Sequence, residues 1–274
     1  MDAKKILFIA QEITPYLPES EIATICRNLP QGIQERGREI RTFMPKFGNI
    51  NERRNQLHEV IRLSGMNLII DDTDHPLIIK VASIQSARMQ VYFIDNEDFF
   101  QRKGTTVDEE GNEYEDNDDR SIFYVRGVLE TIKKLRWIPD VIHCHGWISA
   151  LTALYVKRMY VDDPCLKSAK IVYSVYKDDF EKPFADDFVS KLKMDGAKEN
   201  DVKVLKNGAD FVALSKLAID FSDGVIQGSK CINPEIESYI ASKTDIPFLS
   251  YKSEEAYMDE FDKFYDLVMD TKKK

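Results

Sequence analysis

The chain has 274 residues, of which 43% are hydrophobic, so it is long enough to bury a full core in one large domain or two small ones. Its formal net charge is −9, and nothing in the sequence indicates the basic face that nucleic-acid binding requires. The terminal basic run, Lys272 to Lys274, is expected to be a solvated tail. The N-terminal residues show no secretion signal, and no apolar run approaches the roughly 20 residues that span a bilayer, which predicts a cytoplasmic protein without a membrane segment.

Strand and helix alternate from the start of the chain. Lys5 to Ala10 (KILFIA) is an almost continuous apolar run, which is typical of a strand buried on both faces. Ile22 to Arg36 has apolar residues at helical spacing and is followed by Gly37, a residue that favours helix ends. Ile40 to Met44 is predicted as the next strand, which completes a βαβ unit.

The middle of the chain changes character. Residues 57–94 contain short apolar segments separated by turn residues, which predicts a β-rich insertion made of hairpins. Residues 101–119 are polar and acidic with two glycines, and a loop of this length is usually functional or mobile. Ser121 to Leu135 has the apolar spacing of an amphipathic helix.

The remaining segments continue the alternation. In chain order the patterns predict a strand at 141–142, a helix at 148–159, a strand at 170–176, the end of a helix at 203–208 and a short strand at 211–214. Residues 1–250 are therefore predicted to form one α/β domain with a doubly wound, Rossmann-like parallel sheet. Residues 251–274 are assigned to a C-terminal helix, at 253–269, and the basic tail. This helix is expected to dock on its own domain or, alternatively, to cover a surface that a missing second domain leaves bare.

Polar and aromatic residues gather where the strand at 141–142 ends. His143, Cys144, His145 and Trp147 follow it directly, and the carboxyl end of a strand faces the binding crevice of an open α/β sheet. Adjacent strand residues point to opposite faces, so His143 and Cys144 face apart, whereas His143 and His145 can share a face. No further metal ligands lie near in the sequence, so we predict no metal site and no cofactor. The four cysteines are scattered without a C-x-x-C pair, which indicates free thiols: Cys26, Cys144, Cys165 and Cys231.

Three stretches resemble the catalytic region of bacterial glycogen synthases and plant starch synthases. The first is Ile6 to Gly48, and the second, Val91 to Trp147, contains EYEDNDDR and DVIHCHGW, which are similar to the family's Tyr-x-Asp-Asn-x-x-Arg and His-Ala-His-Asp-Trp elements. The third comprises KIVYSVYKDDFEK and LKNGADFVALS. Together they cover about residues 5–230. The resemblance implies the first half of a GT-B fold, in which two Rossmann-like domains flank a cleft and glucose passes from ADP-glucose to an α-1,4-glucan. The second domain, which binds most of the donor, would need well over about 100 further residues.

The resemblance fails where the donor should bind. The family's Lys-Thr-Gly-Gly-Leu, which grips the donor diphosphate, is replaced by Pro18, Glu19, Ser20, Glu21 and Ile22. Proline supplies neither a cation nor an N–H, and two carboxylates stand where two phosphates would lie. These acids are expected to reject nucleotide sugars and, compatibly, to favour the helix start through its dipole.

Two further positions depart from the family. Tyr176 replaces the histidine that lies beside the reacting sugar, and Gly146 replaces the aspartate of His-Asp-Trp. No residue of this chain is therefore assigned a catalytic role.

The matching residues lie on the acceptor side of the family's site. As candidates for contact with glucan the resemblance marks Tyr114, Asp116, Asn117, His143, His145 and Trp147. In the alternative interpretation Trp147 and His143 pack beneath a helix, while Asp116 and Asn117 cap the helix that starts near Ser121.

Two hypotheses follow from these observations. In the first, the chain is a non-catalytic, glycogen-synthase-like module that binds α-glucan or a protein partner such as a complete glycogen synthase. In the second, it is an active glucosyltransferase whose second domain comes from a separate polypeptide. Neither hypothesis involves nucleic acid or a membrane.

Overall fold

The computed structural model describes residues 3–271, so the basic tail predicted at 272–274 lies outside the described residues. The strands are β1 (Lys5–Ala10), β2 (Glu39–Pro45), β3 (His58–Glu59), β4 (Met66–Ile70), β5 (Thr73–Ile84), β6 (Met89–Asp95), β7 (Val141–His145), β8 (Lys170–Val175), β9 (Gly224–Gln227) and β10 (Phe248–Leu249). The α-helices are α1 (Glu21–Glu35), α2 (Glu97–Phe100), α3 (Asn117–Leu135), α4 (Thr152–Leu154), α5 (Phe188–Met194), α6 (Phe211–Phe221), α7 (Pro234–Ser242) and α8 (Tyr257–Asp270). A 3₁₀ turn at Trp147–Ser149 leads toward α4, and a π-helical turn at Tyr155–Met159 follows α4.

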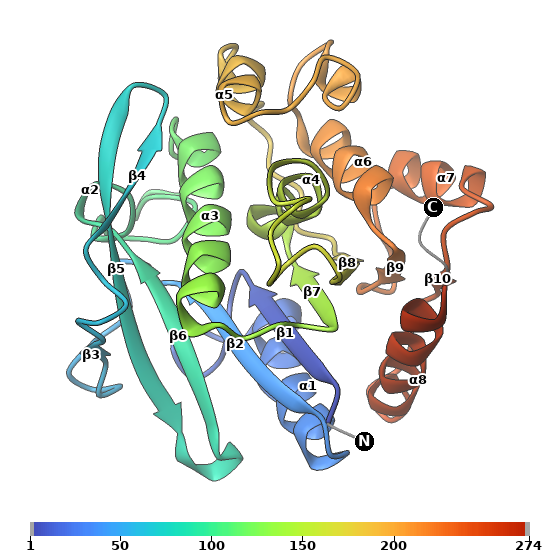
Figure 1. Cartoon of the computed structure of the whole chain (residues 1–274), viewed down its shortest axis with the longest axis horizontal. Coiled ribbons are helices and arrows are strands. Elements are labelled where there is room, and N and C mark those ends of the chain that lie inside the picture. The colour runs from blue at the N-terminus through green and yellow to red at the C-terminus, as the bar shows by residue number, and fades with distance from the viewer. Residues whose placement is uncertain (1–2, 272–274) are drawn as a thin grey trace.

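One sheet organises the described residues, in the order β10-β9-β8-β7-β1-β2-β6-β5-β3, with β4 paired to β5 (Figure 1). β1 runs parallel to both β2 and β7, and the chain builds outward from it first through β2 and β6 and later through β7, β8 and β9. The direction of winding therefore changes between β1 and β7, which is the point where doubly wound sheets form their binding crevice. The predicted α/β, doubly wound fold is confirmed.

The β-rich segment predicted at 57–94 extends the sheet. β6 pairs with β2 in parallel, which makes it a strand of the doubly wound part. β5 pairs antiparallel with β6, and β4 and β5 form a hairpin with pairs from Met66–Leu77 to Ile70–Thr73. The hairpin lies beside α3 at the edge of the molecule (Figure 1).

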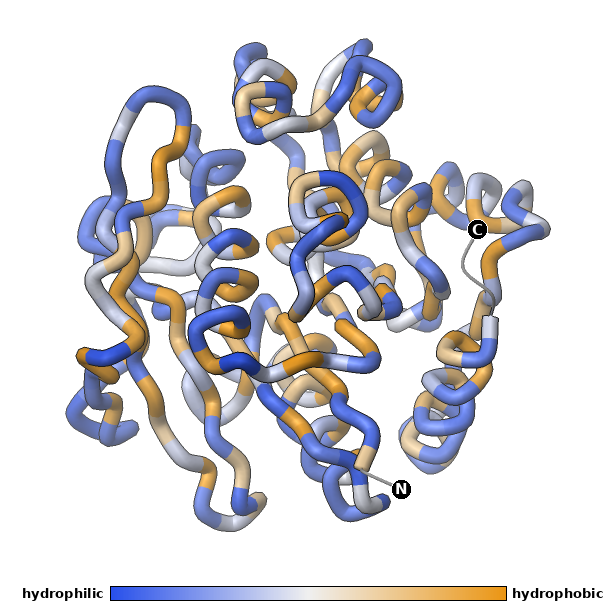
Figure 2. Tube along the Cα trace, in the orientation of Figure 1, coloured by the Kyte–Doolittle hydropathy of each residue, from blue (hydrophilic) through white to orange (hydrophobic). Residues whose placement is uncertain are grey.

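Helices cover both faces of the sheet. α3, α4 and α6 lie on one face, and α1 and α8 lie on the other (Figure 1). Alternate side chains of β1 serve the two layers, because Leu7 and Ile9 belong to the larger core, whereas Ile6 and Phe8 belong to the cluster beneath α1 and α8. In Figure 2 the central strands carry hydrophobic stretches interrupted by hydrophilic residues. No helix of the described residues is long and apolar enough to cross a membrane.

Helix α8 is built into this core although it is the last element of the chain. Its buried face contributes Phe261, Phe264, Tyr265 and Val268 to the cluster that also contains residues of β1, β7, β8 and β9. The strand beneath it leaves room, since a Cβ on Gly224 would lie 2.6 Å from a methyl group of Val268. In Figure 2, hydrophilic and hydrophobic residues alternate along α8, as expected for a helix with one buried stripe.

The strand predicted at 211–214 is wrong, because these residues open α6. Asp210 caps that helix by accepting a hydrogen bond from the backbone N–H of Ala213 at 2.7 Å. A short apolar run such as FVALS does not distinguish a buried helix from a strand, and the cap was the discriminating signal. The helix end predicted at 203–208 is instead a 3₁₀ turn at Lys203–Leu205.

Candidate functional site

The candidate residues form two groups. His143 and His145 lie inside β7, which extends to His145 instead of ending at 142 as predicted, and Trp147 follows it. Tyr114 and Asp116 lie in the loop before α3, and Asn117 is the first residue of that helix. His143 and His145 point to the same side of β7, and their ring centroids are 3.8 Å apart. Both side chains are fully buried, on the face that α8 covers. The sequence correctly predicted that the two imidazoles share a face.

Both histidines are held inside a polar network. His143 has its Nδ1 2.7 Å from the hydroxyl of Tyr265 and its Nε2 2.7 Å from the hydroxyl of Ser174. His145 has its Nδ1 2.7 Å from the hydroxyl of Tyr176, while its Nε2 is buried without a hydrogen-bond partner. Burial lowers the pKa of both imidazoles, that of His145 to about 3, so both are neutral near pH 7. The network joins β7 to β8 and α8.

Tyr176 occupies a closely fitted, buried position. It is 1% exposed, and burial raises the pKa of its phenol well above the usual value. A Cβ on Gly228 would lie 2.5 Å from Cε1 of the tyrosine ring, so glycine at 228 leaves room for the tyrosine. The Tyr176 ring packs against Gly228, and its hydroxyl is hydrogen-bonded to His145. The raised pKa keeps the phenol protonated near pH 7.

The turn after β7 is shaped by Gly146. Its φ of 83° and ψ of 159° lie in a region that side chains rarely adopt, and a Cβ there would lie 2.7 Å from Oε1 of Gln11. An aspartate does not fit this backbone. The next residue, Trp147, is 3% exposed, and its ring packs against Phe180 and Phe184 at centroid distances of 5.0 and 5.8 Å. This supports the interpretation that Trp147 packs in the core.

A carboxylate stands directly beside that turn. Asp178 follows β8 and accepts a hydrogen bond from the backbone N–H of Trp147 at 3.1 Å. Burial, with smaller contributions from neighbouring acids including Glu12, raises the pKa of Asp178 to about 7. A half-buried carboxyl group that titrates near neutrality therefore lies at the carboxyl end of the sheet, next to the position where the family has its aspartate.

The predicted donor loop is lined by carboxylates. Ser20 is the N-cap of α1, accepting a hydrogen bond from the N–H of Ala23 at 2.9 Å, and its own hydroxyl donates to Glu12 at 2.5 Å. Glu21 accepts a hydrogen bond from the hydroxyl of Ser229. The same hydroxyl oxygen accepts a hydrogen bond from the backbone N–H of Lys177. Ser20 therefore caps α1, and the glutamates around the helix start make its surroundings negative.

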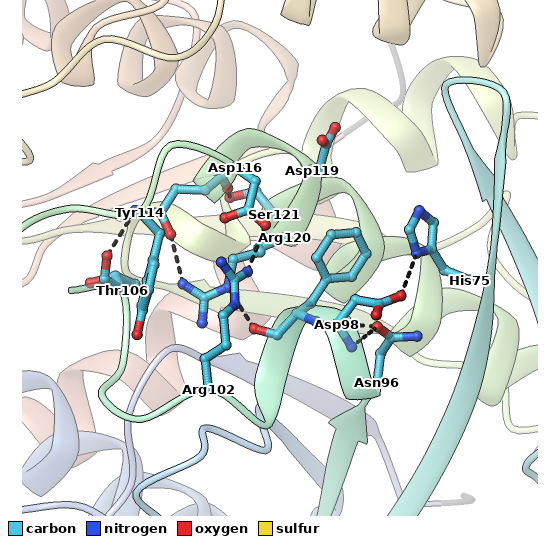
Figure 3. A network of polar contacts seen from close by, with 12 residues as sticks. His75, Asn96, Asp98, Arg102, Thr106, Tyr114, Asp116, Asp119, Arg120 and Ser121 are labelled. Carbon is cyan, nitrogen blue, oxygen red and sulfur yellow. Dashed lines mark hydrogen bonds and ion pairs between the residues drawn. The ribbon is translucent and has the colours of Figure 1, made fainter. Parts of the chain in front are cut away.

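The loop that carries Tyr114 is organised by two arginines (Figure 3). Arg120 is 1% exposed and donates to the carbonyls of Phe99 and Thr105 and to the side chain of Asn117, at 2.7–2.9 Å. Its guanidinium carbon lies 4.8 Å from the centre of the Tyr114 ring, and that of Arg102 lies 4.5 Å from it. The Tyr-x-Asp-Asn-x-x-Arg element, residues 114–120, therefore holds the loop against the start of α3, mainly through Arg120.

Asp116 and Asn117 do not cap α3 in the way predicted. The helix begins at Asn117, the Asp116 side chain makes no capping hydrogen bond, and its carboxylate instead pairs with Arg102 at 2.6 Å (Figure 3). Asn117 donates to the carbonyl of Thr106 at 2.9 Å. Both side chains therefore bind the loop instead of the helix N-terminus, Asp116 through Arg102 and Asn117 through the carbonyl of Thr106.

Comparisons with known proteins agree with this geometry. The starch synthase catalytic domain family matches residues 5–244. The chain belongs to this family. It is 38% identical over 173 residues to a glycogen synthase of Chlorobium luteolum, covering 63% of this chain and 35% of that protein, and 34% identical over 216 residues to one of Chlorobium phaeovibrioides, covering 75% and 44%. Its fold resembles the catalytic domain of starch synthase IV from Arabidopsis thaliana bound to ADP and acarbose, with a TM-score of 0.70 and 18% identity over 90% of this chain and 51% of that chain.

The chain thus spans about 35–44% of the length of the curated relatives it matches. The chain therefore folds as a starch-synthase-type glycosyltransferase domain. All four cysteines are free thiols, as predicted, and no group of three or more potential metal ligands is arranged for an ion anywhere in residues 3–271.

Three residues near the site escaped the sequence analysis. Asp178 follows strand β8 by three residues, and its place at a strand's carboxyl end was a usable signal. Ser229 follows β9, a strand that the sequence pattern did not reveal. Tyr265 lies 122 residues from His143, so no local pattern connects the two.

Proposed function

We propose that this starch-synthase-type domain does not transfer glucose by itself and serves as a non-catalytic module of α-glucan metabolism. The observation that carries the proposal is the start of α1, where Glu19 and Glu21 replace the neutral residues of the family's diphosphate grip and Pro18 replaces its lysine. A diphosphate placed there would meet like charges at short range, which costs several kcal/mol at about 4 Å even with an effective dielectric near 20.

The other altered positions support the same proposal. Tyr176 is buried and bound to His145, so its phenol is not placed to act on a ligand in this arrangement. Gly146 has a backbone that an aspartate does not adopt without strain, and Gln11 occupies the space beside it. The surrounding residues therefore fit the two substitutions, Tyr176 for the family's histidine and Gly146 for its aspartate.

The module would act by binding α-glucan or a protein partner, either a complete glycogen synthase or a separate second domain. Tyr114 and Asp116 remain partly exposed, whereas His143, Asn117 and Trp147 are buried. Glucan contact, if present, would therefore involve the loop of Tyr114 and Asp116. The burial of the remaining candidates favours a regulatory role through a protein partner.

Calorimetric titration of the purified chain with ADP-glucose and, separately, with maltoheptaose tests the proposal. We expect no heat from ADP-glucose. Heat from maltoheptaose that is lost in Tyr114→Ala would favour glucan over a protein as the bound partner. Incorporation of labelled glucose into glycogen by the chain would overturn the proposal and support the competing candidate, an active glucosyltransferase completed in trans.

Restoring the family residues at the start of α1 provides a second test, with an exposed glutamate elsewhere as the matched control. The double variant Pro18→Lys, Glu21→Gly restores the family residues at two positions and should raise affinity for ADP-glucose above that of the unchanged chain. Glu235→Gln, an exposed substitution in the first turn of α7, should leave that affinity unchanged.

A further inference from the structure

A cavity of about 390 Å³ lies between the start of α1 and the segment that leads into α8. Its walls include Glu19 and Glu21 from α1 and its approach, and Glu254, Tyr257 and Phe261 from the C-terminal segment. This volume falls within the range of small-molecule sites, and the neighbouring end of β9 places the cavity at the carboxyl edge of the sheet, where ligands of doubly wound folds bind.

The side chains around the cavity carry more negative than positive charge, with three glutamates and one lysine in its wall. Within the described residues, Glu19 and Glu254 make no hydrogen bond or ion pair, and Glu21 accepts a hydrogen bond from the neutral hydroxyl of Ser229. The one ammonium group in the wall, that of Lys252, lies 3.9 Å from Glu260 outside the cavity. An anion entering here would be repelled, whereas a cation would gain unshared carboxylate partners.

Aromatic rings form the rest of the wall. Tyr257 and Phe261 meet edge to face at a centroid distance of 5.7 Å, and Tyr251 is 37% exposed beside them. Within residues 3–271 the cation–π pairs of the fold involve other rings, so these three have no cation of their own. Aromatic faces next to carboxylates recognise organic cations, because the ring attracts the charge and the carboxylate binds the N–H groups.

We infer that this cavity binds a small organic cation, an aliphatic chain that carries ammonium or guanidinium groups. The cation lies against Tyr251 and Tyr257 and pairs with Glu19 and Glu254. The inference goes beyond the proposed function, since it requires contact with neither glucan nor nucleotide. It also assigns the acids at the start of α1 a positive role, the attraction of a cation, besides the exclusion of phosphate.

Calorimetric titration with agmatine and with spermidine tests the inference. We expect both amines to bind the unchanged chain, and an increase in salt from about 0.05 to 0.5 M to weaken binding several-fold because the contacts are ionic. In Glu19→Gln, Glu254→Gln the dissociation constant should rise by about tenfold or more, since two charge-assisted contacts are lost. Glu255→Gln, which changes the adjacent exposed acid outside the cavity, should leave the constant unchanged.

A second variant separates the aromatic contribution. Tyr251→Leu keeps an apolar side chain at an exposed position and should weaken agmatine binding by about three- to fivefold through loss of the cation–π contact. Melting temperatures of all variants show whether the fold is retained. Binding of acetyl-Gly-Arg-Gly-amide in place of the free amines would assign the cation to a protein side chain and keep its chemistry.

Three results would overturn the inference. The first is no heat from agmatine, spermidine or the peptide at millimolar concentrations. The second is equal affinity in the Glu19→Gln, Glu254→Gln variant, and the third is competition between agmatine and ADP-glucose for one site. Nucleotide binding without competition would contradict only the proposed function, so the two proposals fail separately.

Discussion

Replacement of Tyr265 by phenylalanine tests how α8 is held on the sheet. The hydroxyl of Tyr265 lies 2.7 Å from Nδ1 of His143, and both side chains are fully buried. Tyr265→Phe removes one oxygen and leaves the imidazole nitrogen without a partner in an apolar layer. Leaving a buried polar group unpaired costs about 1–3 kcal/mol, so the free energy of unfolding should fall by that amount.

Equilibrium unfolding in urea, followed by circular dichroism, measures this loss. The slope against urea should stay unchanged while the midpoint moves to lower concentration, because the same surface is exposed on unfolding. For a chain of this size each kcal/mol also lowers the melting temperature by about 2–4 °C.

Tyr257→Phe is the matched control in the same helix. The Tyr257 hydroxyl makes no hydrogen bond within the described residues, so this variant should lose less than about 0.5 kcal/mol. Equal stability of the two variants would refute the reasoning, because it would mean that the bond to His143 contributes nothing to the docking of α8.

Three other substitutions probe the site. Burial raises the pKa of Asp178 from 3.8 to about 7, so the folded state binds this proton more tightly than the unfolded state, and the free energy of unfolding falls as pH rises between those two values. Asp178→Asn removes this loss, so between pH 5 and pH 8 the variant should gain on the order of 2 kcal/mol relative to the unchanged chain in urea titrations. A shift of the opposite sign would refute the assignment. Arg120→Lys cannot reproduce three buried hydrogen bonds and should cost about 2–4 kcal/mol in the same assay, whereas Arg102→Lys, at a partly exposed pair, should cost less than about 1 kcal/mol. Gly146→Ala should lower the free energy of unfolding by about 2–3 kcal/mol, because the added Cβ would clash with the side chain of Gln11 and the backbone would be strained. Gly111 has a similar φ but lies in open space, so Gly111→Ala should cost only about 1 kcal/mol. Equal melting temperatures of the two variants would contradict this difference.

The sequence by itself determined the first βαβ unit and the family, whereas β9 and α6 were missed. The prediction for β1 matched at both ends, and that for α1 lay one residue from each observed bound, because a continuous apolar run indicates burial on two faces and helical spacing indicates burial on one. The strand predicted at 141–142 was too short, since β7 also contains His143, Cys144 and His145. The replacement of the diphosphate grip at Pro18 and Glu21 was equally visible, since it concerns residue chemistry at consecutive positions.

Tertiary structure decided which partners the site residues have. The sequence placed His143 and His145 on one face, but only the docking of α8 supplies Tyr265, and only the register of β7 with β8 supplies Ser174. Local pattern records which side a residue faces, whereas hydrogen-bond partners and strand order depend on packing between segments far apart in the chain. For the same reason the helix at α6 was missed, since its apolar run fits either element until the surrounding layers select the helix.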